Sequence, residues 1–191
     1  MPTKTLVKRE LPLTLLEMRT HLKLDDPDQV NELDALILAR CGAACDFAQH
    51  HTQQAIGKQT LELALSCFPA WELPLPFSPV TSLASIKYVD AAGVVQTCGL
   101  NSYALNDYGR QHQAIPGYGT IWPITRAQWD AVKVQYECGY TAATLPDAIR
   151  SALLLILTHL HENNQAVSTL KLEEIPLGAV DLLNTEKVWG F

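Results

Sequence analysis

The sequence has little positive charge, no long hydrophobic run and no paired-cysteine pattern. Its 14 Lys and Arg residues against 20 Asp and Glu give a net charge of −6, and the absence of any basic tract argues against tight binding to nucleic acid. The longest unbroken apolar run, residues 152–157, is far short of the ~18 residues that a membrane-spanning helix needs, so we expect no membrane partner. The five cysteines lack CxxC spacing, which predicts reduced thiols in a reducing compartment.

Signatures of catalysis and cofactor binding are also missing. The chain contains no GxxxxGK[ST], GxGxxG, GxSxG or HExxH motif. His159 and His161 are two residues apart on a predicted helix and therefore point in different directions. Cys41 and Cys45 share a helix face without further ligands nearby, which is typical of core residues. We expect no catalytic residue, no cofactor and no metal site, and we predict that the protein is not an enzyme.

Length and composition favour one domain, or one domain with a sizeable insertion. The chain has 191 residues, 48% hydrophobic and 18% charged, which is enough to bury a core. Fewer charges than the ~25% usual for soluble domains predict that a partner covers part of the surface. Basic residues near the amino terminus are followed by no apolar segment and no cleavage site, so we expect synthesis in the cytosol.

Helical periodicity occupies the first quarter of the chain. Thr14 precedes a predicted helix over residues 15–23 as its cap, and Glu17 is placed to reach back and complete a capping box. A second helix follows Pro27, and Gly57 is expected to close it. Its apolar residues recur at helical spacing; they are Val30, Leu33, Ile37, Cys41, Ala44 and Ala48.

The last quarter is also predicted to be helical. Pro146 and Asp147 open a third helix. Leu154 and Leu155 widen its apolar face, so we expect both sides of this helix to meet protein. Residues 175–183 add one or two more helical turns.

Between the helices the apolar period changes from about 3.6 residues to 2, which indicates strands. The predicted strands cover residues 61–67, 83–89, 94–100, 103–105 and 132–138. Asp90 and Gly93 are expected to form a tight turn that joins strands 83–89 and 94–100 into a hairpin. Residues 68–80 are proline-rich and predicted to form no regular ladder, and residues 106–119 are predicted to be a long exposed loop.

These patterns predict an α+β fold. Helices from both ends of the chain form a helical platform, because each needs the other to bury its apolar face. An antiparallel β subdomain is inserted into it. The expected boundaries are 12–56 and 146–191 for the helical domain and 58–140 for the β subdomain.

Large apolar side chains outside the predicted core are candidates for contact with a partner, since rigid rings anchor interfaces well. Packing of the aromatic rings onto the β subdomain explains their presence equally well. The two aromatic residues at the carboxyl terminus are expected to dock either on their own subunit or on a neighbour. The interface candidates are Leu154, Leu155, Tyr108, Tyr118, Trp122, Trp189 and Phe191, with Trp71 and Phe77 noted in the proline-rich connection.

The order of these features resembles the head-tail connector (head-completion or adaptor) proteins of tailed bacteriophages and prophages, in the longer form with a β insertion. The resemblance covers most of the chain and rests on several short segments in order. They are LTLLEMRTHLKLD at 13–25, the long helix over 32–52, KQTLEL at 58–63, PLPFSPVTSLASIKY at 74–88, VQYECGY at 134–140, LPDAIRSA at 145–152 and IPLGAVDLL at 175–183.

The resemblance implies a structural protein of the virion that is made in the host cytoplasm. Its members form an oligomeric ring under the portal, extend the DNA channel and join the DNA-filled head to the tail. The implied partners are further copies of the chain, the portal protein and the next connector or tail-completion protein, with double-stranded DNA only passing through. A net charge of −6 fits that role, because an acidic wall repels DNA phosphates rather than holding them.

Two other function classes stay open at this point. Exposed aromatic rings of the β subdomain also suit a small-molecule or carbohydrate-binding module. An enzyme would need side chains gathered only in space, for instance His112, Tyr118 and Asp107. For the predicted loop 106–119 we expect mobility in the isolated subunit and order on assembly.

Overall fold

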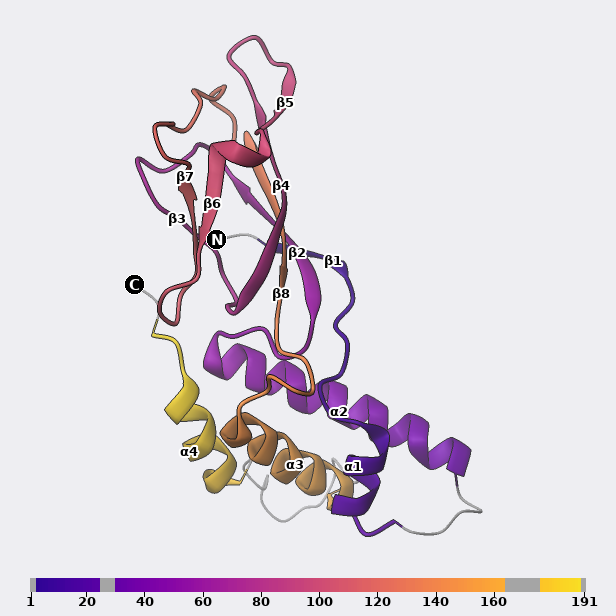
Figure 1. The fold of residues 1–191 in the computed structure, drawn as a ribbon. Coiled ribbons are helices and arrows are strands. Elements are labelled where there is room, and N and C mark those ends of the chain that lie inside the picture. The colour runs from indigo at the N-terminus through magenta and orange to yellow at the C-terminus, as the bar shows by residue number, and fades with distance from the viewer. Residues whose placement is uncertain (1–2, 25–29, 164–175, 190–191) are drawn as a thin grey trace. The chain divides into compact units, whose positions relative to one another are not determined.

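The computed structural model describes residues 3–24, 30–163 and 176–189, and it confirms the α+β fold (Figure 1). The chain forms two compact units. The β unit consists of Met1–Glu10 and Lys58–Gly139, and the helical unit consists of Leu11–Gly57 and Tyr140–Phe191. Each unit is described by itself below.

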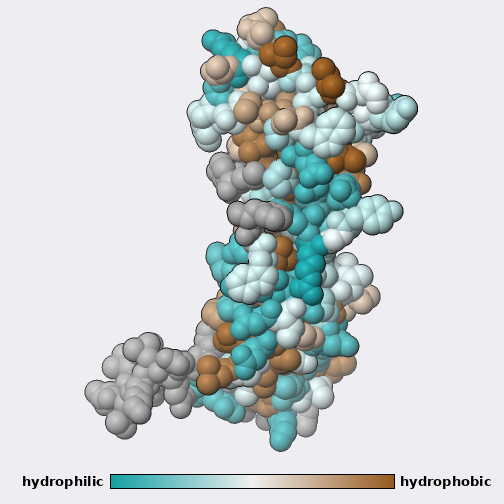
Figure 2. Space-filling model, turned by 90° about the vertical axis from the view of Figure 1, so that its left-hand side faces the viewer, coloured by the Kyte–Doolittle hydropathy of each residue, from teal (hydrophilic) through white to brown (hydrophobic). Residues whose placement is uncertain are grey.

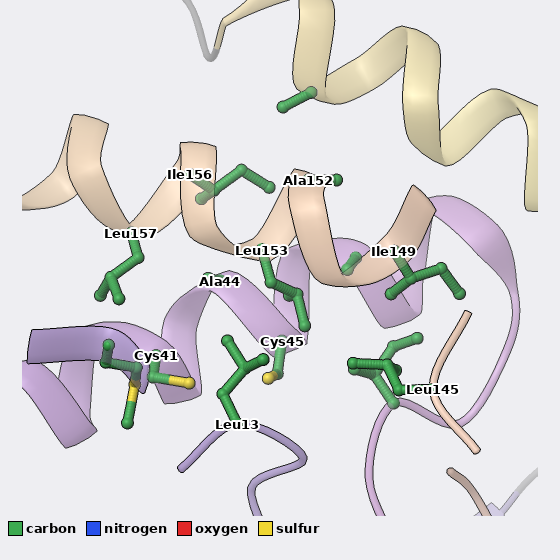
Figure 3. Close-up of a cluster of buried hydrophobic side chains, with 14 of the residues drawn as sticks. Leu13, Cys41, Ala44, Cys45, Leu145, Ile149, Ala152, Leu153, Ile156 and Leu157 are labelled. Atoms are coloured by element: carbon green, nitrogen blue, oxygen red, sulfur yellow. The ribbon is translucent and has the colours of Figure 1, made fainter. Parts of the chain in front are cut away.

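The helical unit contains α1 (Leu15–His21), α2 (Val30–Thr52), α3 (Asp147–Glu162) and α4 (Leu177–Glu186). α3 packs against both α2 and α4, so much of its broad apolar face is buried within the unit. Figure 3 shows Leu153 of α3 pointing toward Leu13 and Cys45, and all three side chains are buried. The predicted stripe of α2 supplies the other side of this core through Ile37, Cys41, Ala44 and Ala48.

The ends of the first two helices differ from expectation in two details. Thr14 caps α1 as predicted, because its Oγ1 accepts a hydrogen bond from the Glu17 N–H at 3.2 Å. The Glu17 carboxylate does not complete a capping box but binds Arg150 of α3 at 2.7 Å. α2 ends at Thr52, before Gly57, and Gln53 leaves the helix with a positive φ of 58°. Pro27 lies outside the described residues.

The larger sheet of the β unit has five antiparallel strands in the order β1-β2-β8-β4-β5. Their bounds are β1 (Thr3–Val7), β2 (Gln59–Leu65), β8 (Val132–Cys138), β4 (Val80–Val89) and β5 (Val95–Thr97). β8 lies at the centre and covers the predicted residues. β2 ends at Leu65, so the prediction that residues 61–67 form one strand was wrong at its end, and Cys67 is exposed.

A smaller sheet of three strands, β3-β7-β6, corrects two predicted irregular segments. β6 (Tyr103–Asn106) was predicted as a short strand and is confirmed. β7 (Gln113–Pro116) lies inside the predicted loop 106–119 and pairs with β6, so that segment is mostly a hairpin. β3 (Leu73–Pro74) pairs with β7 and gives the proline-rich connection a short ladder.

The hairpin between β4 and β5 confirms the predicted turn at Asp90 and Gly93. Val89 pairs with Val95, and Gly93 has a φ of 87°, which favours glycine. The Asp90 carboxylate accepts hydrogen bonds from the Gln96 side chain and from the Val94 and Ala92 N–H groups. These bonds stabilise the charged form and lower the pKa of Asp90.

Candidate interaction surface

Trp122 is the anchor of an irregular segment, residues 117–131, that follows β7. Its ring stacks on Phe68 with centroids 4.7 Å apart, and its Nε1–H donates to the backbone oxygen of Trp71 at 2.7 Å. Phe68 in turn contacts Tyr88 of β4 edge to face at 5.9 Å. Trp122 therefore holds segment 117–131 against the proline-rich connection, which is the packing role that the sequence left as an alternative.

Apolar side chains around this anchor are exposed. Ile121, Ile124 and Trp71 have 85%, 84% and 62% of their surface accessible. Together with Trp122 we call these residues the tryptophan–isoleucine patch. It borders an open hollow of about 480 Å³ lined by 67–70 and 121–125. Figure 2 shows strongly hydrophobic side chains at the surface of the β unit, at the top of the view. Exposed apolar groups that gather in this way mark an interaction site.

The two isoleucines were not among the sequence-based candidates. Signals that could have found them were present, since segment 117–131 combines two isoleucines and two tryptophans with no helical or strand periodicity. Large apolar side chains in such an irregular segment have no hydrophobic core that the segment itself could form. Trp129 is a further exposed member of the segment.

The predicted aromatic candidates of the β unit do not gather in one surface. Tyr108 lies in the turn between β6 and β7, whereas Tyr118 follows β7 at the other end of that hairpin. Both side chains are exposed. Of these two tyrosines, Tyr118 belongs to segment 117–131, which also contains Trp122 of the tryptophan–isoleucine patch.

The candidates of the helical unit differ in exposure. Leu154 is partly buried and packs against the core of its own unit, while Leu155 is 39% exposed. Trp189 is 75% exposed, and the Lys187 Nζ lies 4.6 Å from the centre of its ring. Phe191 lies outside the described residues.

The backbone of the carboxyl-terminal segment docks on α2 although the Trp189 ring does not bury itself there. The Val188 N–H donates to the Thr52 oxygen at 2.9 Å, and the Gln54 side chain donates to the Glu186 oxygen. Gln54 also accepts a hydrogen bond from the Tyr140 hydroxyl at 2.6 Å. These contacts fix the segment and present the indole outward.

Of the side chains named for an enzyme, Asp107 and His112 lie in the turn between β6 and β7, whereas Tyr118 follows the other end of β7. Nδ1 of His112 lies 3.0 Å from both the N and the O of Val80, and the His112 N–H donates to Ser78 Oγ at 2.9 Å. His112 thus links two backbone segments, while Tyr118 and Asp107 are exposed.

The histidines of α3 have separate partners, as their spacing predicts. His161 binds the Arg40 guanidinium at 2.8 Å, and His159 contacts Asn163 at 3.1 Å. Across residues 3–24, 30–163 and 176–189, no three His, Cys, Asp or Glu side chains are placed to hold a metal ion. Over the same ranges, no helix has the length and hydropathy required to cross a membrane.

Comparison with known proteins finds its matches among solved structures. No family model matches the chain, and no curated protein does. A chain described as "Neck of empty GTA particle computed with C6 symmetry" superposes with a TM-score of 0.81 at 22% identity, over 100% of this chain and 97% of that chain. Chains of "Virion of native gene transfer agent (GTA) particle" and "Neck of native GTA particle computed with C12 symmetry" give TM-scores of 0.78 and 0.75 at 22% and 21% identity, over the same shares.

This chain has the fold of a GTA neck chain. Because the superposition covers all of this chain and nearly all of the other, both the helical unit and the β unit belong to the GTA neck-chain fold. The β unit is therefore not an addition peculiar to this sequence.

Proposed function

We propose that this protein is a structural component of the neck of a tailed phage-like particle. It forms an oligomeric ring under the portal, extends the DNA channel and joins the DNA-filled head to the tail. One observation carries the proposal, the superposition over the full chain on chains from GTA necks at TM-scores up to 0.81. The segments that resemble phage connector proteins support it from the sequence alone.

The chemistry of the surface agrees with a joining role rather than a catalytic one. Large apolar and aromatic side chains are exposed in both units, which suits contacts with protein. The net charge of −6 suits a wall past which DNA slides. We place the protein at the head-tail junction of the virion after synthesis in the bacterial host cytoplasm, with further copies, the portal and the next connector or tail-completion protein as partners.

Loss of the gene tests this function directly. Deleting it from the phage or prophage that encodes it should leave DNA-filled heads and separate tails, visible by negative-stain electron microscopy. Expression of the chain in trans should restore joined particles. Normal numbers of tailed particles without the protein contradict the proposal.

The exposed Trp189 is proposed to anchor the carboxyl-terminal segment to the portal or to an adjacent copy. Trp189→Ser should reduce capture by immobilised portal protein, because the indole is presented outward and buries little within its own unit. Tyr108→Ser, which removes an exposed ring of the β unit outside the tryptophan–isoleucine patch, is the matched control and should be captured normally. Equal capture of wild type and Trp189→Ser rejects this anchor.

A further inference from the structure

We infer that in the ring the tryptophan–isoleucine patch of one copy packs against the β1 edge of the next copy. The inference rests on the proposed function, since it describes how copies of the β unit meet. It names a second copy of this chain as the occupant of the patch.

The patch has the composition of an interface core. Two isoleucines and a tryptophan are exposed around an anchored second tryptophan. Arg126 does not place a charge on it, because its Nη1 lies at the turn that contains Gly93, and Asp130 pairs with Lys133 at 3.5 Å. Burial of such rings and branched side chains gives most of the affinity of a typical interface.

The β1 edge is a second exposed apolar surface. β1 pairs with β2 on one side only, and it is the outer strand of the larger sheet. Leu6 and Val7 are exposed on it. An outer strand also has unpaired backbone groups that favour contact with another chain.

The two surfaces lie at opposite edges of the β unit, as a closed ring requires. Segment 117–131 is tied to β4 by the hydrogen bond from the Arg126 N–H to the Val89 oxygen, at 3.0 Å, and by the Phe68–Tyr88 contact. β8 and β2 separate β4 from β1 in the larger sheet. In Figure 1, β1 and the smaller sheet lie on opposite sides of β4 and β8. Head-to-tail rings join two different faces of each subunit in this way.

Charges beside the two surfaces are complementary. Lys4 and Lys8 flank Leu6 and Val7 and are exposed. Glu72 follows Trp71 and is exposed, and no ion pair involves it within the described ranges. Opposite charges at the rim favour the correct register of two surfaces. A single contact of this kind covers both exposed surfaces in every copy of a closed ring.

Cysteine cross-linking of the full chain tests the contact. In a Cys67→Ser background, Ile124→Cys and Val7→Cys are combined in one chain and treated with a short bismaleimide. Because each copy then has one cysteine at each surface, we expect a ladder of dimer, trimer and larger species on a denaturing gel. A mixture of the two single variants should give dimers only.

The matched control replaces Ile124→Cys by Tyr108→Cys, an exposed position at the far end of the β6–β7 hairpin, and should give no ladder. A ladder from the control pair and none from the test pair overturns the inference, as does cross-linking of Ile124→Cys to itself alone. A chain that stays monomeric at every concentration also overturns it, since this contact would then not hold two copies together.

A second measurement separates this contact from the proposed function. Ile121→Ser with Ile124→Ser should raise the concentration needed for self-association about tenfold or more, with an unchanged circular dichroism spectrum. If self-association is unchanged, the inferred contact is wrong. Head-tail joining in the particle would still support the proposed function. Melting shifts of wild type with oligosaccharides, absent with the double variant, would make a sugar the occupant and overturn it.

Discussion

The ion pair between Glu17 and Arg150 joins two helices that lie 133 positions apart in the chain. Nη1 of Arg150 lies 2.7 Å from Oε1 of Glu17, and each side chain keeps about a quarter of its surface exposed, at 25% and 29%. Nη2 of Arg150 also donates to the Ala142 oxygen. Charge-assisted bonds that are partly shielded from water contribute more than surface ion pairs.

Arg150→Met should therefore lower the free energy of unfolding by about 1–2 kcal/mol, measured by urea titration. Lys58→Met is the control, because the Lys58–Glu137 pair is longer, at 3.6 Å, and about half exposed; its effect should be below about 0.5 kcal/mol. Glu17→Gln should cost little more in the Arg150→Met background. If the losses in unfolding free energy of the two single variants instead add up in the double variant, Glu17 and Arg150 do not interact directly.

The five thiols differ in access and in their readiness to ionise. Cys67 is exposed, while Cys41, Cys45, Cys98 and Cys138 are buried. Burial raises the pKa of Cys138 to about 12 and also raises the pKa of Cys98, which leaves almost no reactive thiolate at neutral pH.

One thiol per folded chain should therefore react rapidly with Ellman's reagent at pH 8, and all five should react in denaturant. Cys67→Ser should abolish the rapid phase without changing the total by more than one thiol. A second rapid thiol in the folded chain contradicts the described packing. The same variant provides the clean background for the cross-linking experiment.

Among the elements, α3 shows how a helix with an unusually broad apolar face is used. Its buried residues meet α2 and α4 within the same unit. Leu154 and Leu155, which widen this face, were predicted from the sequence to contact a partner. Leu154 packs against the core, so part of the apolar face of α3 is buried within the helical unit. Leu155 is a part of this face that stays exposed.

Leu153→Ala should cost about 3 kcal/mol in unfolding free energy, because it removes a fully buried side chain and leaves a cavity. Leu155→Ser should cost under about 1 kcal/mol at its more exposed position but should weaken self-association if a neighbouring copy covers it. Urea titration and light scattering measure the two effects. Unchanged association with Leu155→Ser removes this residue from the interface candidates.

Elements with their own periodicity were predictable from the sequence, and elements held only by distant pairing were not. α2 and β8 carry clear 3.6-residue and 2-residue patterns and were found. β1 is exposed along nearly its whole length, so it has no buried and exposed alternation to detect. β7 is a four-residue strand that exists because β6 and β3 pair with it from both sides.

The surface was less predictable than the fold for a similar reason. Trp122 was named as an interface candidate, with packing onto the β subdomain as the alternative. Its contacts with Phe68 and Trp71 could not be predicted, because these residues lie about fifty positions away in the sequence. Ile121 and Ile124 were not named from the sequence, and only the fold shows that their side chains are exposed. Exposure of an apolar residue in an irregular segment depends on contacts that no local pattern encodes.

At the scale of the whole molecule, the chain connects the two units at three points, residues 10–11, 57–58 and 139–140. The first residue of β2, Gln59, pairs directly with the last residue of β8, Cys138, so the connections at 57–58 and 139–140 lie about 5 Å apart. Among the residues that the structure describes, the buried core cluster of the helical unit consists of side chains from that unit alone. Both observations indicate that the helical unit folds by itself.

A chain that starts at Leu11 and replaces residues 58–139 by a short Gly-Ser linker should therefore keep a helical circular dichroism spectrum and a cooperative urea transition. About four linker residues span the gap, at up to ~3.5 Å each. Ile149→Ser in the same shortened chain is the control and should abolish cooperativity, because Ile149 is fully buried in the core cluster. A gradual urea transition of the shortened chain, together with binding of a hydrophobic dye to a loosened core, contradicts independent folding. A cooperative shortened chain that no longer self-associates would separate the two tasks, with the helical unit supplying a stable body and the β unit supplying contact between copies.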